Sequence, residues 1–244
     1  MSTTTPWSER IMVALDYPDE AGATKLINEL QGIPCWMKVG MQLFYAAGPG
    51  FVEKLKLQGY RVFLDLKLHD IPNTVKGASA SVAQLGVDMF NVHAAGGVAM
   101  MEAALEGAAQ GAAAAGLQQR PLVIGVTQLT STSQRTLNDE IGIPGSVLDA
   151  VMRYASFTRQ AGLDGVVCSA HEAAPIKRAI GADFVTVTPG IRPAGADIGD
   201  QSRVMTPQQA FAQGSDYIVI GRPITASPDP RRAMESIIKE LDEQ

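Results

Sequence analysis

The feature that most constrains the fold is a regular alternation of short apolar runs with longer segments of helical periodicity. Strict strand–helix alternation predicts parallel strands joined by right-handed crossovers. Eight such units in 244 residues favour an α/β fold of the (β/α)8 or TIM barrel type over an open doubly wound sheet. The expected strands cover residues 10–16, 35–39, 61–67, 87–92, 121–126, 164–168, 183–187 and 217–220. The expected helices cover residues 19–31, 41–58 with a break at 48–50, 72–85, 97–115, 146–161, 171–180, 206–213 and 230–242.

Composition excludes several other classes of protein. Polar low-complexity tracts are absent, which argues against disorder, and no run approaches about 18 apolar residues without a charge, which argues against a membrane span. The net charge of −5 argues against a nucleic-acid partner. The two cysteines, Cys35 and Cys168, both lie in apolar runs and are expected to be buried free thiols in a reducing cytoplasm.

The chain contains no long linker, so we expect one domain. Residues 1–9 carry no apolar signal core and are expected to form a flexible N-terminal tail, and residues 10–244 are expected to form the barrel.

Polar or small residues follow nearly every expected strand. In a (β/α)8 barrel the active site lies at the C-terminal ends of the strands. The sequence therefore predicts a site built from these positions: Asp16, Lys38, Asp65, Lys67, His93, Thr127 to Thr130, Ser169, Thr188 to Gly190, Gly221 and Arg222.

The segment at residues 63–70 carries the most information about chemistry. Strand alternation turns Asp65 and Lys67 to one face and the leucines to the other, and the apolar face must meet the helices. Charges that point into a barrel are unfavourable unless paired, so Asp65 and Lys67 could be a stabilising ion pair. Asp70 could be an N-cap before Pro72. Their combination with the other charges at strand ends favours a catalytic site over these structural roles.

Two loops have the character of a phosphate site. Residues 188–192 (TPGIR) follow the seventh expected strand and residues 221–224 (GRPI) follow the eighth. Glycine lets backbone N–H groups approach an anion, and Arg192 and Arg222 can add charge-assisted hydrogen bonds. Residues 194–203 are long, polar and glycine-rich, as a mobile lid would be.

Dinucleotide and Walker motifs are absent, and the histidines do not fall at metal-ligand spacing, so no metal is expected. We expect His93 to be a partly buried, hydrogen-bonded residue, and His69 and His171 to lie in loops or at helix starts. Lys67 could form a Schiff base, although the neighbouring acids favour a charged ammonium.

Residues 65–74 (DLKLHDIPNT) resemble the signature of the orotidine 5′-phosphate decarboxylase family, with its Asp-x-Lys-x-x-Asp core. The resemblance covers almost the whole chain and implies a stand-alone enzyme. Further matching segments occur in family order at residues 13–16 (VALD), 38–40 (KVG), 127–131 (TQLTS), 188–192, 199–203 (GDQSR) and 221–224.

The resemblance implies a cytoplasmic lyase that converts orotidine 5′-phosphate to UMP and carbon dioxide in de novo pyrimidine biosynthesis, without cofactor or metal. It implies a homodimer with active sites at the interface. Lys67 would protonate the carbon that loses carbon dioxide, within a network of Lys38, Asp65, Lys67 and Asp70 of the partner subunit.

The resemblance also assigns the substrate contacts. Asp16 would bind the ribose hydroxyls together with Thr74 of the partner subunit, and Thr130 would lie beside the pyrimidine. The phosphate would be held by the loops that contain Pro189, Arg192, Gln201, Gly221 and Arg222. The alternatives are a magnesium-dependent sugar-phosphate decarboxylase of the same barrel group and a non-catalytic barrel that binds a phosphate ligand.

Overall fold

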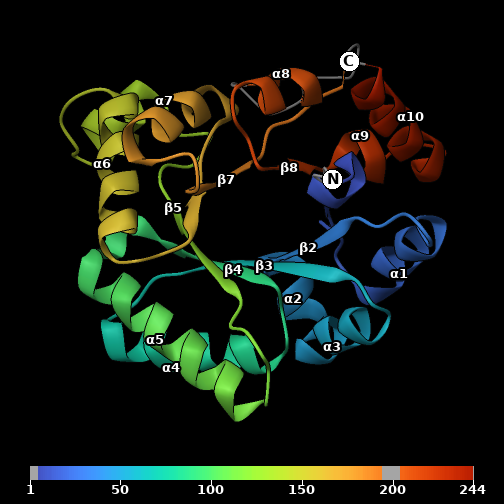
Figure 1. Cartoon of the computed structure of the whole chain (residues 1–244), viewed down its shortest axis with the longest axis horizontal. Helices are drawn as coiled ribbons and strands as arrows, with labels where there is room; N and C mark the ends of the chain where they lie inside the picture. Colours follow the sequence, from blue (N-terminus) through green and yellow to red (C-terminus); the bar gives the residue numbers. More distant parts are fainter. Residues whose placement is uncertain (1–4, 194–203, 244) are drawn as a thin grey trace.

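The computed structural model describes residues 5–193 and 204–243, and its strands close into a parallel barrel in chain order. Every strand expected from the sequence is present, and the (β/α)8 fold is confirmed (Figure 1). The strands are β1 (Ile11–Ala14), β2 (Trp36–Gly40), β3 (Arg61–Leu68), β4 (Met89–His93), β5 (Leu122–Val126), β6 (Gly165–Val167), β7 (Val185–Thr188) and β8 (Tyr217–Ile220).

Helices surround the barrel and follow the expected pattern, including a break at Gly48, whose φ is 74°. None of the helices in the described ranges is both long and apolar enough to cross a membrane. The helices that match expectation are α1 (Glu20–Glu29), α2 (Met41–Ala47), α3 (Pro49–Leu57), α4 (Pro72–Gln84), α5 (Val98–Ala114), α6 (Val147–Gln160), α7 (Ala170–Ile180), α8 (Pro207–Ala212) and α10 (Pro230–Asp242). Short elements that the sequence analysis did not predict are α9 (Arg222–Thr225), the 3-10 helices η1 (Trp7–Arg10) and η2 (Ala94–Gly96), and the π-helical turn η3 (Thr136–Glu140).

The N-terminal segment differs from the expected tail of residues 1–9, because η1 begins at Trp7 and packs on the barrel. The Trp7 ring lies 4.8 Å from the ring of Phe211, between centroids. The Arg10 guanidinium lies 4.3 Å from the Phe211 centroid and donates to the backbone oxygen of Ser215 at 2.9 Å. Partial burial of the Trp7 ring and the contact of Arg10 with the Phe211 ring stabilise the segment.

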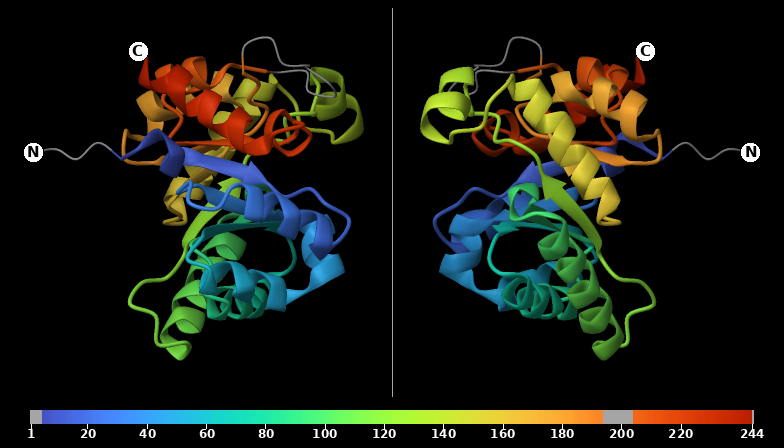
Figure 2. Two further views of the ribbon diagram at one scale, coloured as in Figure 1. Left: turned by 90° about the vertical axis from the view of Figure 1, so that its right-hand side faces the viewer. Right: turned by 90° about the vertical axis from the view of Figure 1, so that its left-hand side faces the viewer.

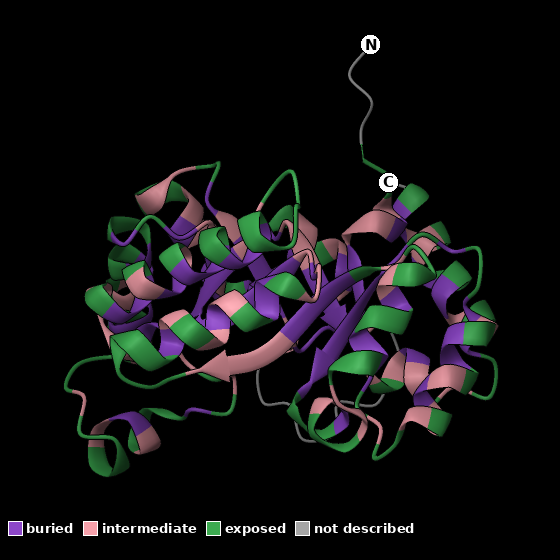
Figure 3. Ribbon diagram, turned by 90° about the horizontal axis from the view of Figure 1, so that it is seen from below, coloured by how far each residue is buried: buried purple, intermediate pink, exposed green. Residues whose placement is uncertain are grey.

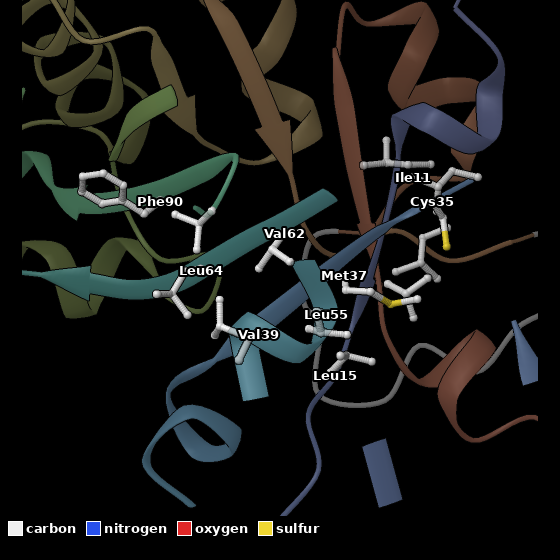
Figure 4. Close-up of a cluster of buried hydrophobic side chains, with 14 of the residues drawn as sticks. Ile11, Leu15, Cys35, Met37, Val39, Leu55, Val62, Leu64 and Phe90 are labelled. Atoms are coloured by element: carbon white, nitrogen blue, oxygen red, sulfur yellow. The ribbon is translucent and has the colours of Figure 1, made fainter. Parts of the chain in front are cut away.

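The core has an outer and an inner layer. The outer layer lies between strands and helices, and Figure 4 shows Val39, Val62, Leu64 and Phe90 from the strands with Leu55 from α3. Figure 3 shows the same arrangement by burial, with buried strands inside and exposed residues on the outer faces of the helices. The inner layer fills the barrel with Met12, Ala14, Trp36, Phe63, Met89, Ile124, Val187 and Val219.

The inner layer closes one end of the barrel. Trp36 and Tyr217 begin their strands, and their rings meet at a centroid distance of 5.2 Å. The large apolar side chains therefore occupy the N-terminal ends of the strands, which leaves room for polar side chains at the C-terminal ends.

Helices α4 and α5 pack at unusually close range, side by side in Figures 1 and 2. A Cβ atom added to Gly107 would lie 2.1 Å from the carbonyl oxygen of Lys76. A Cβ atom added to Gly111 would lie 2.1 Å from the carbonyl oxygen of Ala80. The two glycines of α5 thus permit backbone contact with α4, the helix that directly follows β3.

We expect Gly111→Ala to lower the free energy of unfolding by about 2 kcal/mol, because the new methyl group forces the two backbones apart. The control is Gly50→Ala in α3, where an added Cβ meets nothing within 4 Å. The control should stabilise the protein by less than about 1 kcal/mol through helix propensity. Urea unfolding of both variants measures the difference, and equal effects would contradict the packing argument.

Candidate active site

A cavity of about 430 Å³ opens at the C-terminal ends of the strands. Most of the predicted site residues in the described part of the chain lie in its wall, but six do not: Asp70, Thr74, His93, Thr127, Ser169 and Thr188. The predicted residues that line it are Asp16, Lys38, Asp65, Lys67, Thr130, Pro189, Arg192, Gly221 and Arg222.

Charges of alternating sign run along one side of the cavity. The Lys38 ammonium lies 3.0 Å from Asp16 Oδ1 and 3.5 Å from Asp65 Oδ2. The Lys67 ammonium lies 2.7 Å from Asp65 Oδ1. Each lysine thus has a carboxylate partner, and Asp65 has a cation on each side.

Asp65 is the most constrained member of this series. All three charged side chains are largely buried: Lys38 is 8% exposed, Asp65 is 15% exposed and Lys67 is 22% exposed. Burial alone would raise the pKa of Asp65, but Lys38, Lys67 and hydrogen bonds from Lys67 and Asn91 hold this pKa below its ordinary value. Asp65 is therefore ionised at neutral pH and faces two cations.

The backbone of β3 departs from regular geometry where these charges lie. Asp65 and Lys67 both reach the cavity, as alternation predicts, and the leucines between and after them pack on the outer core. However, Lys67 has a φ of 54°, and the pairing of β3 with β4 shifts register between Leu64 and Leu68. Strand alternation thus predicts correctly which side chains face the cavity, but it does not predict the positive φ of Lys67.

Asn91 on β4 is a site residue that the sequence analysis did not identify. Its side chain is fully buried and bonds both Asp65 and the backbone of Lys67. Strand alternation could have identified it, because Asn91 lies on the same face of β4 as Met89, which fills the barrel, and His93.

The opposite side of the cavity is formed by the two predicted phosphate loops. Gly190 has a φ of 82°, which favours glycine, and Arg192 is almost fully buried beside it. Gly221 and Arg222 begin the short helix α9. The predicted lid at residues 194–203, with Gln201, lies outside the described residues.

Asp70 and Thr74 are exposed and lie outside this cavity, Asp70 just before α4 and Thr74 in its first turn. The interpretation of Asp70 as an N-cap is wrong, because Ile71 holds the N-cap position, and the helix has no side-chain capping hydrogen bond there. Asp70 lies one residue too early, and its Oδ1 accepts the N–H of Ile71 at 2.6 Å. The Ile71 side chain is 67% exposed next to it.

The histidines and cysteines follow expectation in position. His69 lies between β3 and α4, and His171 lies in the first turn of α7. His93 is half-buried with its ring 5.5 Å from that of His69, and burial together with His69 and Lys67 lowers the pKa of His93. Both cysteines are buried thiols, and Cys168 contributes to the cavity wall. Across the described residues, no group of three or more His, Cys, Asp or Glu side chains is arranged to hold a metal ion.

Comparisons with known proteins agree on one family. Residues 9–237 match the family model described as "Orotidine 5′-phosphate decarboxylase / HUMPS family". A protein of Moorella thermoacetica named orotidine 5′-phosphate decarboxylase is 51% identical over 96% of this chain and 92% of its own length. A protein of the same name from Streptococcus thermophilus is 51% identical over 96% of this chain and 98% of its own. The crystal structure of orotidine 5′-phosphate decarboxylase from Lactobacillus acidophilus superposes with a TM-score of 0.84 at 40% identity, covering 96% of this chain and 99% of that one.

We expect Asp65→Asn to lower the free energy of unfolding by about 3 kcal/mol at pH 7, because two lysines lose their shared counter-charge. The folded-state pKa of Asp65 lies below the ordinary 3.8, so its contribution is complete above that pH and disappears as the pH falls through the folded-state pKa. Denaturant unfolding at pH 7 and near pH 3 measures this difference.

The matched control is Asp183→Asn, which removes an exposed ion pair with Arg159. Its effect at pH 7 should be much smaller than that of Asp65→Asn, because solvent screens this exposed pair. A pH-independent effect of Asp65→Asn, or one no larger than the control, would contradict the electrostatic argument.

Proposed function

The chain belongs to the orotidine 5′-phosphate decarboxylase / HUMPS family, and we propose that it converts orotidine 5′-phosphate to UMP and carbon dioxide as a carboxy-lyase of pyrimidine biosynthesis. The observation that carries the proposal is the ammonium of Lys67, which faces the cavity 2.7 Å from an ionised Asp65. The two glycine- and arginine-containing loops across the cavity support a phosphate-bearing substrate.

The chemistry requires stabilisation of negative charge on a ring carbon. When the bond to the carboxylate breaks, carbon dioxide leaves and the electron pair stays on a carbon that cannot delocalise it, so the barrier is high. A fixed ammonium stabilises this charge electrostatically as it develops. Lys67 then transfers a proton to the carbon, forming the new C–H bond, and the neutral amine regains its proton from solvent. We propose that no cofactor or metal takes part.

The neighbouring charges support this role for Lys67. Asp65 orients the Lys67 ammonium through their ion pair, while Lys38 and Asp16 extend the series along the cavity wall. We propose that Asp70 of the partner subunit completes the network in a homodimer. Asp70, Ile71 and Thr74 are all exposed around the start of α4, so they are accessible to a second subunit there.

The cavity wall supports binding of a nucleotide. Phe63, Val126, Val167 and Val219 offer apolar surface to the pyrimidine, and Thr130 is proposed to lie beside it. Asp16, whose side chain is 65% exposed, is proposed to bind the ribose hydroxyls with Thr74 of the partner subunit. The phosphate is proposed to contact the loops that contain Pro189, Arg192, Gln201, Gly221 and Arg222. The two buried cysteine thiols support a cytoplasmic location.

The decisive experiment follows loss of the orotate absorbance band with chelator-treated protein and orotidine 5′-phosphate. We expect turnover by the wild-type protein and none by Lys67→Ala, which should keep the wild-type fold. Activity that needs added magnesium, or tight UMP binding without turnover, would support the two alternative functions instead. A fully active Lys67→Ala would remove the proposed proton donor.

Hybrid dimers test the contribution of Asp70 across the interface. Lys67→Ala and Asp70→Ala are each expected to be inactive as homodimers. In a hybrid, one of the two sites receives both lesions and the other receives none, so an equal mixture after subunit exchange should recover about a quarter of wild-type activity. If Asp70 acts within its own chain, no activity returns.

Arg222→Ala tests the phosphate site. The substitution should raise KM at least about 30-fold, because a charge-assisted phosphate contact contributes roughly 2 kcal/mol. The effect on kcat should be smaller, since the phosphate is far from the reacting carbon. Steady-state kinetics measures both values, and an unchanged KM would contradict the assignment.

A further inference from the structure

We propose that Asn91 is a positioning residue of this site, whose amide holds the backbone of Lys67 and the carboxylate of Asp65 at the same time. The catalytic consequence rests on the proposed function, but the contacts themselves are a property of the folded chain. Asn91 is absent from the cavity wall, so its influence on the reaction must pass through these two residues.

The contacts of Asn91 form a closed set. Its Oδ1 accepts the backbone N–H of Lys67 at 2.8 Å, and its Nδ2 donates to Asp65 Oδ1 at 2.7 Å. The same Asp65 oxygen accepts the ammonium of Lys67 at 2.7 Å. Both ends of Lys67, its backbone and its charged tip, are therefore fixed through one amide and one carboxylate.

The backbone of Lys67 needs this support. Of the residues described, Lys67 is the non-glycine residue with a positive φ, at 54°, and a side chain in this conformation is disfavoured by roughly 1–2 kcal/mol. The register shift between Leu64 and Leu68 interrupts the regular ladder with β4 over this stretch. The side-chain oxygen of Asn91 supplies an acceptor from β4 for the Lys67 N–H. Such strain persists only where the surroundings over-determine it.

The amide group suits these contacts better than other side chains of its size. The Lys67 N–H requires an acceptor, which orients the amide oxygen toward β3 and leaves the NH2 group facing Asp65. A carboxylate at this position would accept from Lys67 but would repel Asp65. An aliphatic side chain would satisfy neither group and would leave a buried N–H unpaired. Asn91 is completely buried, so solvent does not compete for these hydrogen bonds in the wild-type protein.

Loss of the Asn91 amide should therefore displace the Lys67 ammonium, although Asn91 itself does not line the cavity that would hold the substrate. A displacement of about 1 Å at a reacting group can lower a rate roughly 100-fold. We expect Asn91→Ala to lower kcat by about this factor. KM should change less than about threefold, since the residues proposed to bind the substrate are unchanged. Loss of the Nδ2 hydrogen bond should also raise the pKa of Asp65, which shifts the acid limb of the kcat profile to higher pH.

The matched control is Thr186→Val on β7. Thr186 is also fully buried, and its hydroxyl lies within hydrogen-bond reach of two acceptors for its one proton, the Gly214 carbonyl oxygen at 2.9 Å and Asp216 Oδ2 at 3.1 Å, away from the cavity. This variant should lose stability but keep the wild-type kcat and pH profile. A purely structural role for Asn91 would make the two variants behave alike.

The experiment combines kinetics on orotidine 5′-phosphate with a ¹³C NMR titration of the Asp65 carboxyl group in the free protein. If the wild-type protein does not turn over, the proposed function fails, and the titration still tests Asn91. A wild-type kcat in folded Asn91→Ala, together with an unshifted Asp65 titration, would overturn the proposal.

A second variant and a measurement on the wild-type protein test the proposal if Asn91→Ala does not fold. If Asn91→Ala does not fold, Asn91→Asp preserves the side-chain volume and should lower kcat and raise the pKa of Asp65. If neither variant folds, the side-chain amide protons of Asn91 in the wild-type protein decide the question. They should exchange slowly with solvent, and rapid exchange would overturn the proposal.

Discussion

The carboxylate of Asp65 lies between the ammonium groups of Lys38 and Lys67, and the geometry of the candidate site depends on this contact. A buried carboxylate without partners would be strongly destabilising. The two cations keep Asp65 ionised, and Asp65 in turn holds both cations at the cavity wall. This mutual dependence means that no member can be removed without leaving an unbalanced charge near the others.

The barrel accommodates such charges because its interior is divided along the strands. Rings of Trp36 and Tyr217 close the N-terminal end, and apolar side chains fill the space above them. Polar residues occupy the C-terminal end, where the cavity opens. The same parallel topology brings the predicted phosphate loops after β7 and β8 into one cavity with the charges on β2 and β3, although these segments are far apart in the sequence.

Much of this arrangement could be predicted from the sequence, for identifiable reasons. The alternation of apolar runs and helical segments predicts the barrel, and the polar residues at the C-terminal ends of the strands predict where the site lies. Alternation along β4 could have placed Asn91 on the barrel-facing side, but its contacts and the positive φ of Lys67 could not be predicted, because they depend on the register between two strands. The packing of Trp7 was missed because its partner, Phe211, is distant in the chain. Asp70 resembled a helix cap by composition, but the helix starts one residue too late for its side chain to reach.

A crystal structure of the protein with UMP measures the relation on which the proposed chemistry depends, the distance from Lys67 Nζ to the ring carbon that would lose carbon dioxide. A proton donor must lie within hydrogen-bond reach of its acceptor, so the distance should be about 3 Å, with Asp65 still bonded to the ammonium. A lysine more than about 5 Å from that carbon, or turned toward the helix layer, could not transfer its proton there and would contradict the mechanism.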